Sequence, residues 1–123
     1  MDFMPGRVLV VDDDPAVQAA VVALLASAGY EITTANDGRD ALQFLVRSEQ
    51  KPDLMILDLG MPKVDGATVL AAVRAVRGLE RLPVLVLTGS ATIPDYVHRD
   101  ATSVLEKPFD GPRLLQATSQ LLR

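Results

Sequence analysis

The sequence predicts an α/β fold of the doubly wound class, in which five parallel strands form a sheet with helices on both faces. Short apolar runs of strand length alternate with segments of helical periodicity along the whole chain, which is the pattern of repeated βαβ units. The strand runs are continuously apolar, as strands covered on both faces must be. Because βαβ crossovers are right-handed, such a sheet is expected to carry helices on both faces.

Length and composition predict one domain. The 123 residues are enough to bury about two-thirds of the unfolded surface, so we expect a single domain over residues 1–123. The chain contains no cysteine, which excludes a disulfide framework and a thiolate metal site. No apolar stretch approaches the roughly 20 residues of a membrane span, and an acid, Asp2, stands where a signal peptide would be positively charged. We therefore expect a cytoplasmic protein without a membrane partner.

The charge balance bears on the kind of partner. Acidic side chains outnumber basic ones by 16 to 12, and the basic residues form no cluster. This distribution is unfavourable for direct binding to nucleic acid, which requires a positively charged surface. The composition therefore favours a protein partner or a cation.

The first half of the chain predicts three strands and two helices. An apolar, mostly β-branched run follows Arg7 and is typical of a buried strand. Pro15 suits the first turn of a helix and Gly29 its end, while Asp37 is a favourable cap for a second helix. The predicted elements, in order, are a strand over 7–11, a helix over 15–28, a strand over 30–35, a helix from 37 to the break at Lys51-Pro52, and a strand over 53–57.

The second half completes the alternation. Gly66 opens a helix with apolar side chains on one face, and the strand over 84–87 follows Pro83. Pro94 interrupts the segment 91–99, which therefore predicts only a weak fourth helix. A short strand over 103–106 and an amphipathic helix over 110–122 end the chain. The leucines of this last helix are interpreted as core: Leu114, Leu115, Leu121 and Leu122.

Polar residues stand at the ends of four of the five predicted strands. Asp12 and Asp13 follow the first strand, Asp58 the third, Thr88 the fourth and Lys107 the fifth. The carboxyl ends of parallel strands meet at one edge of the sheet, which is where ligands bind in this class of fold. We therefore expect these side chains to form one site.

The residue types predict metal-dependent phosphorylation. Carboxylates that lie close together repel one another unless a proton or a hard cation neutralises them. Magnesium commonly takes one or two protein carboxylates, which Asp13 and Asp58 could supply. One carboxylate could then attack phosphorus, as in aspartyl-phosphate enzymes, and Asp58 on the central strand is the predicted nucleophile. Thr88 and Lys107 would contact the oxygens of the transferred group.

The same residues lie in stretches that resemble the receiver domain of bacterial two-component response regulators, along nearly the whole chain. The resemblance implies a flavodoxin-like, three-layer (βα)5 fold whose five-stranded parallel sheet has the order 2-1-3-4-5. The stretches that carry it are 8–15, 52–62, Asp65-Gly66, Leu87-Thr88-Gly89 and 106–109.

The resemblance also implies a reaction and its partners. Asp58 would accept a phosphoryl group from a histidine kinase or a histidine phosphotransfer protein. Asp12, Asp13 and Asp58, with the backbone carbonyl of Gly60, would hold Mg²⁺ or Mn²⁺. The domain would then change its contacts with a downstream protein or an output domain and slowly remove its own phosphate, without being a conventional enzyme. Weak homodimerisation is left open.

The resemblance further assigns the response to two residues. Thr88 would follow the phosphoryl group as a switch, and Lys107 would pair with the phosphorylated aspartate; the family also suggests a cis bond between Lys107 and Pro108. Two features depart from the family: Val104 stands where an aromatic residue is usual, and the stretch before Lys107 is shorter by roughly one helical turn. We therefore predict that phosphorylation acts mainly by ordering residues 88–95.

Other interpretations use parts of this pattern. A pseudo-receiver would be a constitutive protein-interaction module, but it should have lost an acidic or lysine position. A flavodoxin-like flavin carrier needs a glycine- and hydroxyl-rich phosphate cradle after the first strand, where this chain is acidic. A phosphatase of the haloacid-dehalogenase type would use Asp12 as nucleophile with Asp14, in a longer chain. Taken singly, Asp13 and Asp14 also suit helix capping, and His98 is expected to face solvent.

Overall fold

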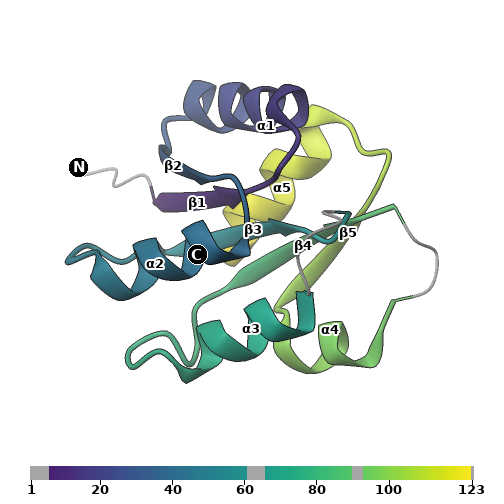
Figure 1. The fold of residues 1–123 in the computed structure, drawn as a ribbon. Coiled ribbons are helices and arrows are strands. Elements are labelled where there is room, and N and C mark those ends of the chain that lie inside the picture. Colours follow the sequence, from purple (N-terminus) through teal and green to yellow (C-terminus); the bar gives the residue numbers. More distant parts are fainter. Residues whose placement is uncertain (1–5, 61–65, 90–92, 123) are drawn as a thin grey trace.

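The computed structural model describes residues 6–60, 66–89 and 93–122. Its elements alternate as predicted: β1 (Arg7–Val11), α1 (Pro15–Ser27), β2 (Glu31–Ala35), α2 (Gly38–Arg47), β3 (Leu54–Asp58), α3 (Gly66–Ala75), β4 (Val84–Thr88), α4 (Asp95–Asp100), β5 (Ser103–Glu106) and α5 (Gly111–Leu121). The strands form one sheet in the order β2-β1-β3-β4-β5, with every neighbouring pair parallel (Figure 1). This confirms the predicted fold and strand order.

The helices form two layers, one on each face of the sheet (Figure 1). Because side chains alternate across a strand, Val8 and Val10 pack with the cluster under α1 and α5, whereas Leu9 and Val11 pack with the cluster under α2, α3 and α4. Every residue of the central strands β3 and β4 is buried, as their continuous apolar runs predict. The leucines predicted as core in α5 all pack with the first cluster: Leu114, Leu115, Leu121 and Leu122.

Aspartate side chains cap three of the helices. The Asp14 carboxylate accepts hydrogen bonds from the backbone of α1, Asp37 from the Asp40 N–H at 2.8 Å, and Asp110 from the Arg113 N–H at 2.9 Å. Each such cap contributes about 1 kcal/mol. Among the helices that the structure describes, none combines the length and the hydropathy needed to cross a membrane.

Several predicted boundaries differ from the structure by a few residues, and those at Asp58, Thr88 and Pro94 bear on the site. Strands β3 and β4 extend to Asp58 and Thr88, so these two polar residues are the last of their strands. Asp58 is paired with β4, and Thr88 is paired with β5. In the described residues from 93 onward, Pro94 does not lie inside a helix; it is the N-cap of the six-residue α4, with φ −61°, because a proline ring suits the start of a helix and obstructs only its interior. The expectations for Met61-Pro62, Asp65 and residues 90–92 lie outside the described residues.

Candidate functional site

The strand ends bring four of the predicted side chains to one edge of the sheet. Asp12 follows β1, Asp58 and Thr88 end β3 and β4, and Lys107 follows β5. Asp12 is only 2% exposed, Thr88 4% and Asp58 5%, although carboxylates are rarely buried unless they are paired. The Lys107 backbone N–H donates to the Thr88 carbonyl at 2.7 Å. The hydrogen bonding between β4 and β5 therefore continues to the backbone of Lys107.

Asp58 is held by two donors. The Lys107 ammonium nitrogen lies 2.9 Å from Oδ1 of Asp58, and the backbone N–H of Gly60 donates to the same oxygen at 2.8 Å. A Cβ atom at Gly60 would lie 3.2 Å from that oxygen, so the glycine keeps the approach to the carboxylate open. The peptide bond between Lys107 and Pro108 is cis, as expected.

Asp12 carries an unsatisfied buried oxygen. Its Oδ1 accepts a hydrogen bond from the Asp14 N–H at 2.9 Å, whereas its Oδ2 is buried and has no hydrogen-bond partner in the described part of the structure. Burial raises the pKa of Asp12 above its usual value, and the negative charge of Asp58 raises it further, against the Asp14 hydrogen bond and the charge of Lys107. An unpaired buried acceptor is costly, and a hard cation is a ligand that would satisfy it.

The donor set therefore fits magnesium in its chemistry. In the described residues, no group of three acidic, histidine or cysteine side chains is arranged to hold a metal. Magnesium does not require one, because it usually keeps several waters and takes one or two carboxylates. The buried oxygen of Asp12 beside the Asp58 carboxylate meets that smaller requirement.

The remaining predicted residues lie at the rim or outside the cluster. The Asp13 side chain is exposed next to the buried Asp12. Asp14 serves as the N-cap of α1, which agrees with the structural interpretation of that residue. His98 is exposed on α4, as predicted.

Gln18 is a positioning residue that the sequence did not reveal. From α1, its Nε2 donates to the carbonyl of Asp12 at 3.2 Å and to the carbonyl of Ala35 at 3.1 Å. It thereby joins the chain after β1 to the end of β2, and so fixes the backbone that carries Asp12. No motif marks this glutamine; the register of β1 against β2 is needed to find it.

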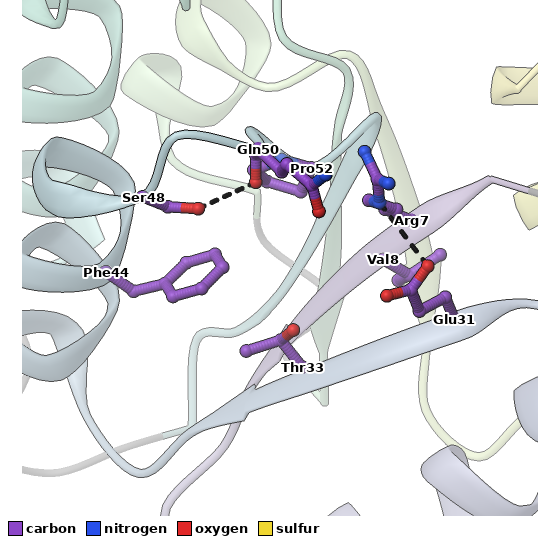
Figure 2. Close-up of a pocket in the computed structure, with 8 residues that line it drawn as sticks. All are labelled: Arg7, Val8, Glu31, Thr33, Phe44, Ser48, Gln50 and Pro52. Carbon is purple, nitrogen blue, oxygen red and sulfur yellow. Dashed lines mark hydrogen bonds and ion pairs between the residues drawn. The ribbon is translucent and has the colours of Figure 1, made fainter.

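A cavity of about 140 Å³ lies at the opposite end of the sheet. Arg7 and Glu31, at the starts of β1 and β2, form an ion pair of 3.3 Å on one side of the cavity, and the Phe44 ring lies on the other side (Figure 2). Ser48 closes another side through its hydrogen bond to the Gln50 carbonyl. None of the predicted site residues lines this cavity, so it is separate from the cluster at the carboxyl ends.

Comparison with protein families matches residues 8–119 to the response regulator receiver domain. The chain belongs to this family. The match includes the five strands apart from Arg7 and the four residues gathered at their ends, and it confirms the resemblance inferred from the sequence. A receiver domain has a phosphoacceptor role in signalling.

Individual proteins that are similar to this chain support the same family. The DNA-binding dual master transcriptional regulator RpaA of Synechocystis sp. is 39% identical over 95% of this chain, which covers 49% of that protein. The chemotaxis response regulator CheY4 of Vibrio cholerae has a similar structure, with a TM-score of 0.88, 33% identity and coverage of 97% of this chain and all of that one. The receiver domain of the sensor histidine kinase PA1611 from Pseudomonas aeruginosa has a TM-score of 0.86 at 28% identity, with 97% of this chain and 98% of that chain covered; it is described with a magnesium ion in its active-site cleft.

The coverage differs between these relatives. This chain spans about half the length of RpaA but the whole of the CheY4 chain.

Proposed function

We propose that this receiver domain accepts a phosphoryl group on Asp58 in a magnesium-dependent reaction and changes its protein contacts as a result. The observation that carries the proposal is the buried Asp58 carboxylate. Its Oδ1 forms an ion pair with the Lys107 ammonium and accepts a hydrogen bond from the Gly60 N–H. Its place at the end of the fully buried strand β3 directs that carboxylate to the edge of the sheet where ligands of doubly wound folds bind.

The proposed donor is a phosphohistidine of a sensor kinase or of a phosphotransfer protein. A carboxylate oxygen of Asp58 attacks the phosphorus, a new P–O bond forms, and the P–N bond breaks. The histidine nitrogen keeps the electron pair of that bond, so a donor ring protonated on its other nitrogen leaves as neutral imidazole. The positive charge of Lys107 stabilises the charge that spreads over the phosphoryl oxygens.

Asp12, Asp13, Asp58 and the backbone carbonyl of Gly60 are the proposed holders of Mg²⁺ or Mn²⁺. The buried, unpartnered Oδ2 of Asp12 supports this assignment, as does the exposed position of Asp13 directly beside it. When bound, the ion would neutralise the carboxylates and act as a Lewis acid toward phosphoryl oxygens.

Thr88 is the proposed link to the response. It is buried at the end of β4 and its carbonyl accepts the Lys107 N–H, so it stands between the lysine and the segment that leads to α4. A change there would alter contacts with a downstream protein or an output domain, or between two copies of the chain. Hydrolysis of the acyl phosphate by water would end the signal. We also propose that residues 1–123 form one domain and that the protein is cytoplasmic.

The test is the intact mass of the protein after incubation with acetyl phosphate, with and without Mg²⁺. The proposal predicts one phosphate adduct that requires the ion. Without an adduct, and without binding of a beryllium fluoride mimic, the domain would instead be a pseudo-receiver that acts as a constitutive interaction module.

A further inference from the structure

Helix α4 is fixed at its C-terminal end by one arginine. Arg74 of α3 donates from Nε and Nη2 to the Asp100 carbonyl, at 3.1 and 2.7 Å. Its Nη1 donates to the carbonyls of Leu82 and Leu79, at 2.6 and 3.3 Å. The last carbonyls of a helix lack partners within the helix, so the guanidinium satisfies one of them and ties it to the chain that precedes β4.

The N-terminal end of α4 is held by a different kind of contact. The helix begins after Pro94, which provides no side-chain cap, and Tyr96 in its first turn packs against the core cluster on this face. A Cβ atom placed on Gly66 would lie 2.9 Å from the Tyr96 hydroxyl oxygen, 3.6 Å from the ring carbon Cε2 of Tyr96 and 2.6 Å from Cδ2 of Leu59. Tyr96 and Leu59 therefore both lie against Gly66, at the start of α3, in space that any larger residue there would fill.

Leu59 connects this contact to the candidate site. It directly follows Asp58, its N–H donates to the Leu87 carbonyl at 3.0 Å, and its side chain packs against the same cluster as Tyr96. A displacement of the backbone at Asp58 would therefore move the leucine side chain that shares the surface of Gly66 with the tyrosine ring.

Tyr96 lies closer to the contact between Leu59 and Gly66 than the other aromatic side chains that the structure describes. Tyr30 and Phe109 pack on the opposite face of the sheet, and Phe44 lies beside the cavity at the far end of the strands. On β5, Val104 packs against the same cluster as Tyr96 but offers no ring. Of these described aromatic residues, Tyr96 is the one found in contact with the glycine that Leu59 touches.

We propose that Tyr96 is a positioning residue that transmits the state of Asp58 to α4 through Leu59 and Gly66, while Arg74 keeps the other end of α4 in place. The inference rests on the proposed phosphorylation of Asp58. Phosphorylation then shifts the first turn of α4 about its fixed C-terminal end, so the change reaches the surface at the N-terminal end of the helix.

Fluorine NMR on the full chain tests this directly. The sequence contains two tyrosines, Tyr30 and Tyr96, so protein labelled with 3-fluorotyrosine gives two signals that the Tyr30→Phe variant assigns. In samples whose phosphate content is measured by intact mass, the Tyr96 signal should shift with the phosphorylated fraction while the Tyr30 signal stays in place. A Tyr96 signal that does not move in phosphorylated protein overturns the inference alone. A native chain that takes no phosphate overturns the proposed function, and this inference with it.

Variants at Tyr96 separate transmission from stability. The Val97 N–H bonds the Pro94 carbonyl at 3.0 Å, and the Ala101 N–H bonds the Val97 carbonyl at 2.9 Å, so these amides report on the two ends of α4. In the native chain, phosphorylation should change exchange several-fold at Val97 and leave Ala101 unchanged. Tyr96→Ala should take up phosphate as the native chain does but lose the change at Val97, and Tyr96→Phe, which keeps the ring, should restore it. A phosphate-dependent change at Val97 that persists in Tyr96→Ala contradicts the proposal.

Discussion

The ammonium group of Lys107 lies 2.9 Å from Oδ1 of Asp58, although the two residues come from different parts of the sheet. Only 7% of the Asp58 side chain and 31% of the Lys107 side chain are exposed, so the pair is partly shielded from solvent. An ammonium held in this position can neutralise charge that develops on a phosphoryl group attached to Asp58.

Replacing Lys107 by alanine is therefore expected to slow phosphorylation. Loss of one such stabilising donor typically lowers a rate by about 100-fold, and a time course of the intact mass with acetyl phosphate measures it. Lys107→Arg should retain part of the rate, because the charge remains while its geometry changes. Native-like labelling of Lys107→Ala would show that the ion pair is only structural.

The buried Asp12 should make stability depend on pH. Its pKa in the folded protein is raised by burial above the usual value of 3.8. As the pH rises past that value the unfolded chain loses its proton first, so the free energy of unfolding falls until the folded carboxyl has also ionised. Asp12→Asn should lack this decrease and be more stable at neutral pH than the native chain, because it buries no charge there. Thermal unfolding between about pH 4 and about pH 8 without divalent cations measures both; parallel curves for the two proteins would refute the expectation.

Magnesium should offset the stability advantage of Asp12→Asn over the native chain. A ligand that binds only the folded state stabilises it by mass action, and the proposed site relies on the unpartnered Oδ2 of Asp12. Excess Mg²⁺ should therefore raise the Tm of the native chain more than that of Asp12→Asn. Exposed Asp40 provides the control, since Asp40→Asn should respond to Mg²⁺ as the native chain does. An equal rise in all three proteins would place the ion elsewhere.

The edge of the sheet at which the polar residues meet could be predicted to within a residue, because it depends on local pattern and on one topological rule. A continuous apolar run that ends in a carboxylate, as before Asp12 and Asp58, indicates both a buried strand and the edge at which it stops. The helix caps Asp14 and Asp37 can also be predicted from the sequence, because a side chain that caps a helix bonds to backbone only a few residues away. These local signals are enough to place the site at the carboxyl ends of the strands.

The contacts that support the site depend on tertiary placement and could not be predicted. Gln18 joins Asp12 to Ala35 only because β1 and β2 have a particular register. Arg74 finds the Asp100 carbonyl only because α3 and α4 pack side by side. The sequence predicts a weak fourth helix, and α4 has only six residues, but its start could not be predicted: Pro94 precedes the helix as its N-cap.

Thr88 should be needed for the response more than for the phosphorylation itself. It is buried at the end of β4, directly before the segment that leads to α4. Thr88→Ala should still take up phosphate from acetyl phosphate, but phosphorylation should no longer protect the amides of residues 88–95 from hydrogen exchange. Thr88→Ser keeps the hydroxyl and should preserve that protection. If the native chain shows no protection there, ordering of this segment is not the response.

Whether Asp58 is the phosphoryl acceptor is decided by the intact mass of the native chain, Asp58→Asn and Asp40→Asn after parallel incubation with acetyl phosphate and Mg²⁺. All three proteins should have a similar fold, because asparagine has nearly the shape of aspartate and Asp40 is exposed. One phosphate on the native chain and on Asp40→Asn, with none on Asp58→Asn, is the predicted result. A phosphate that persists in Asp58→Asn would contradict the account, because the nucleophile would then be another residue.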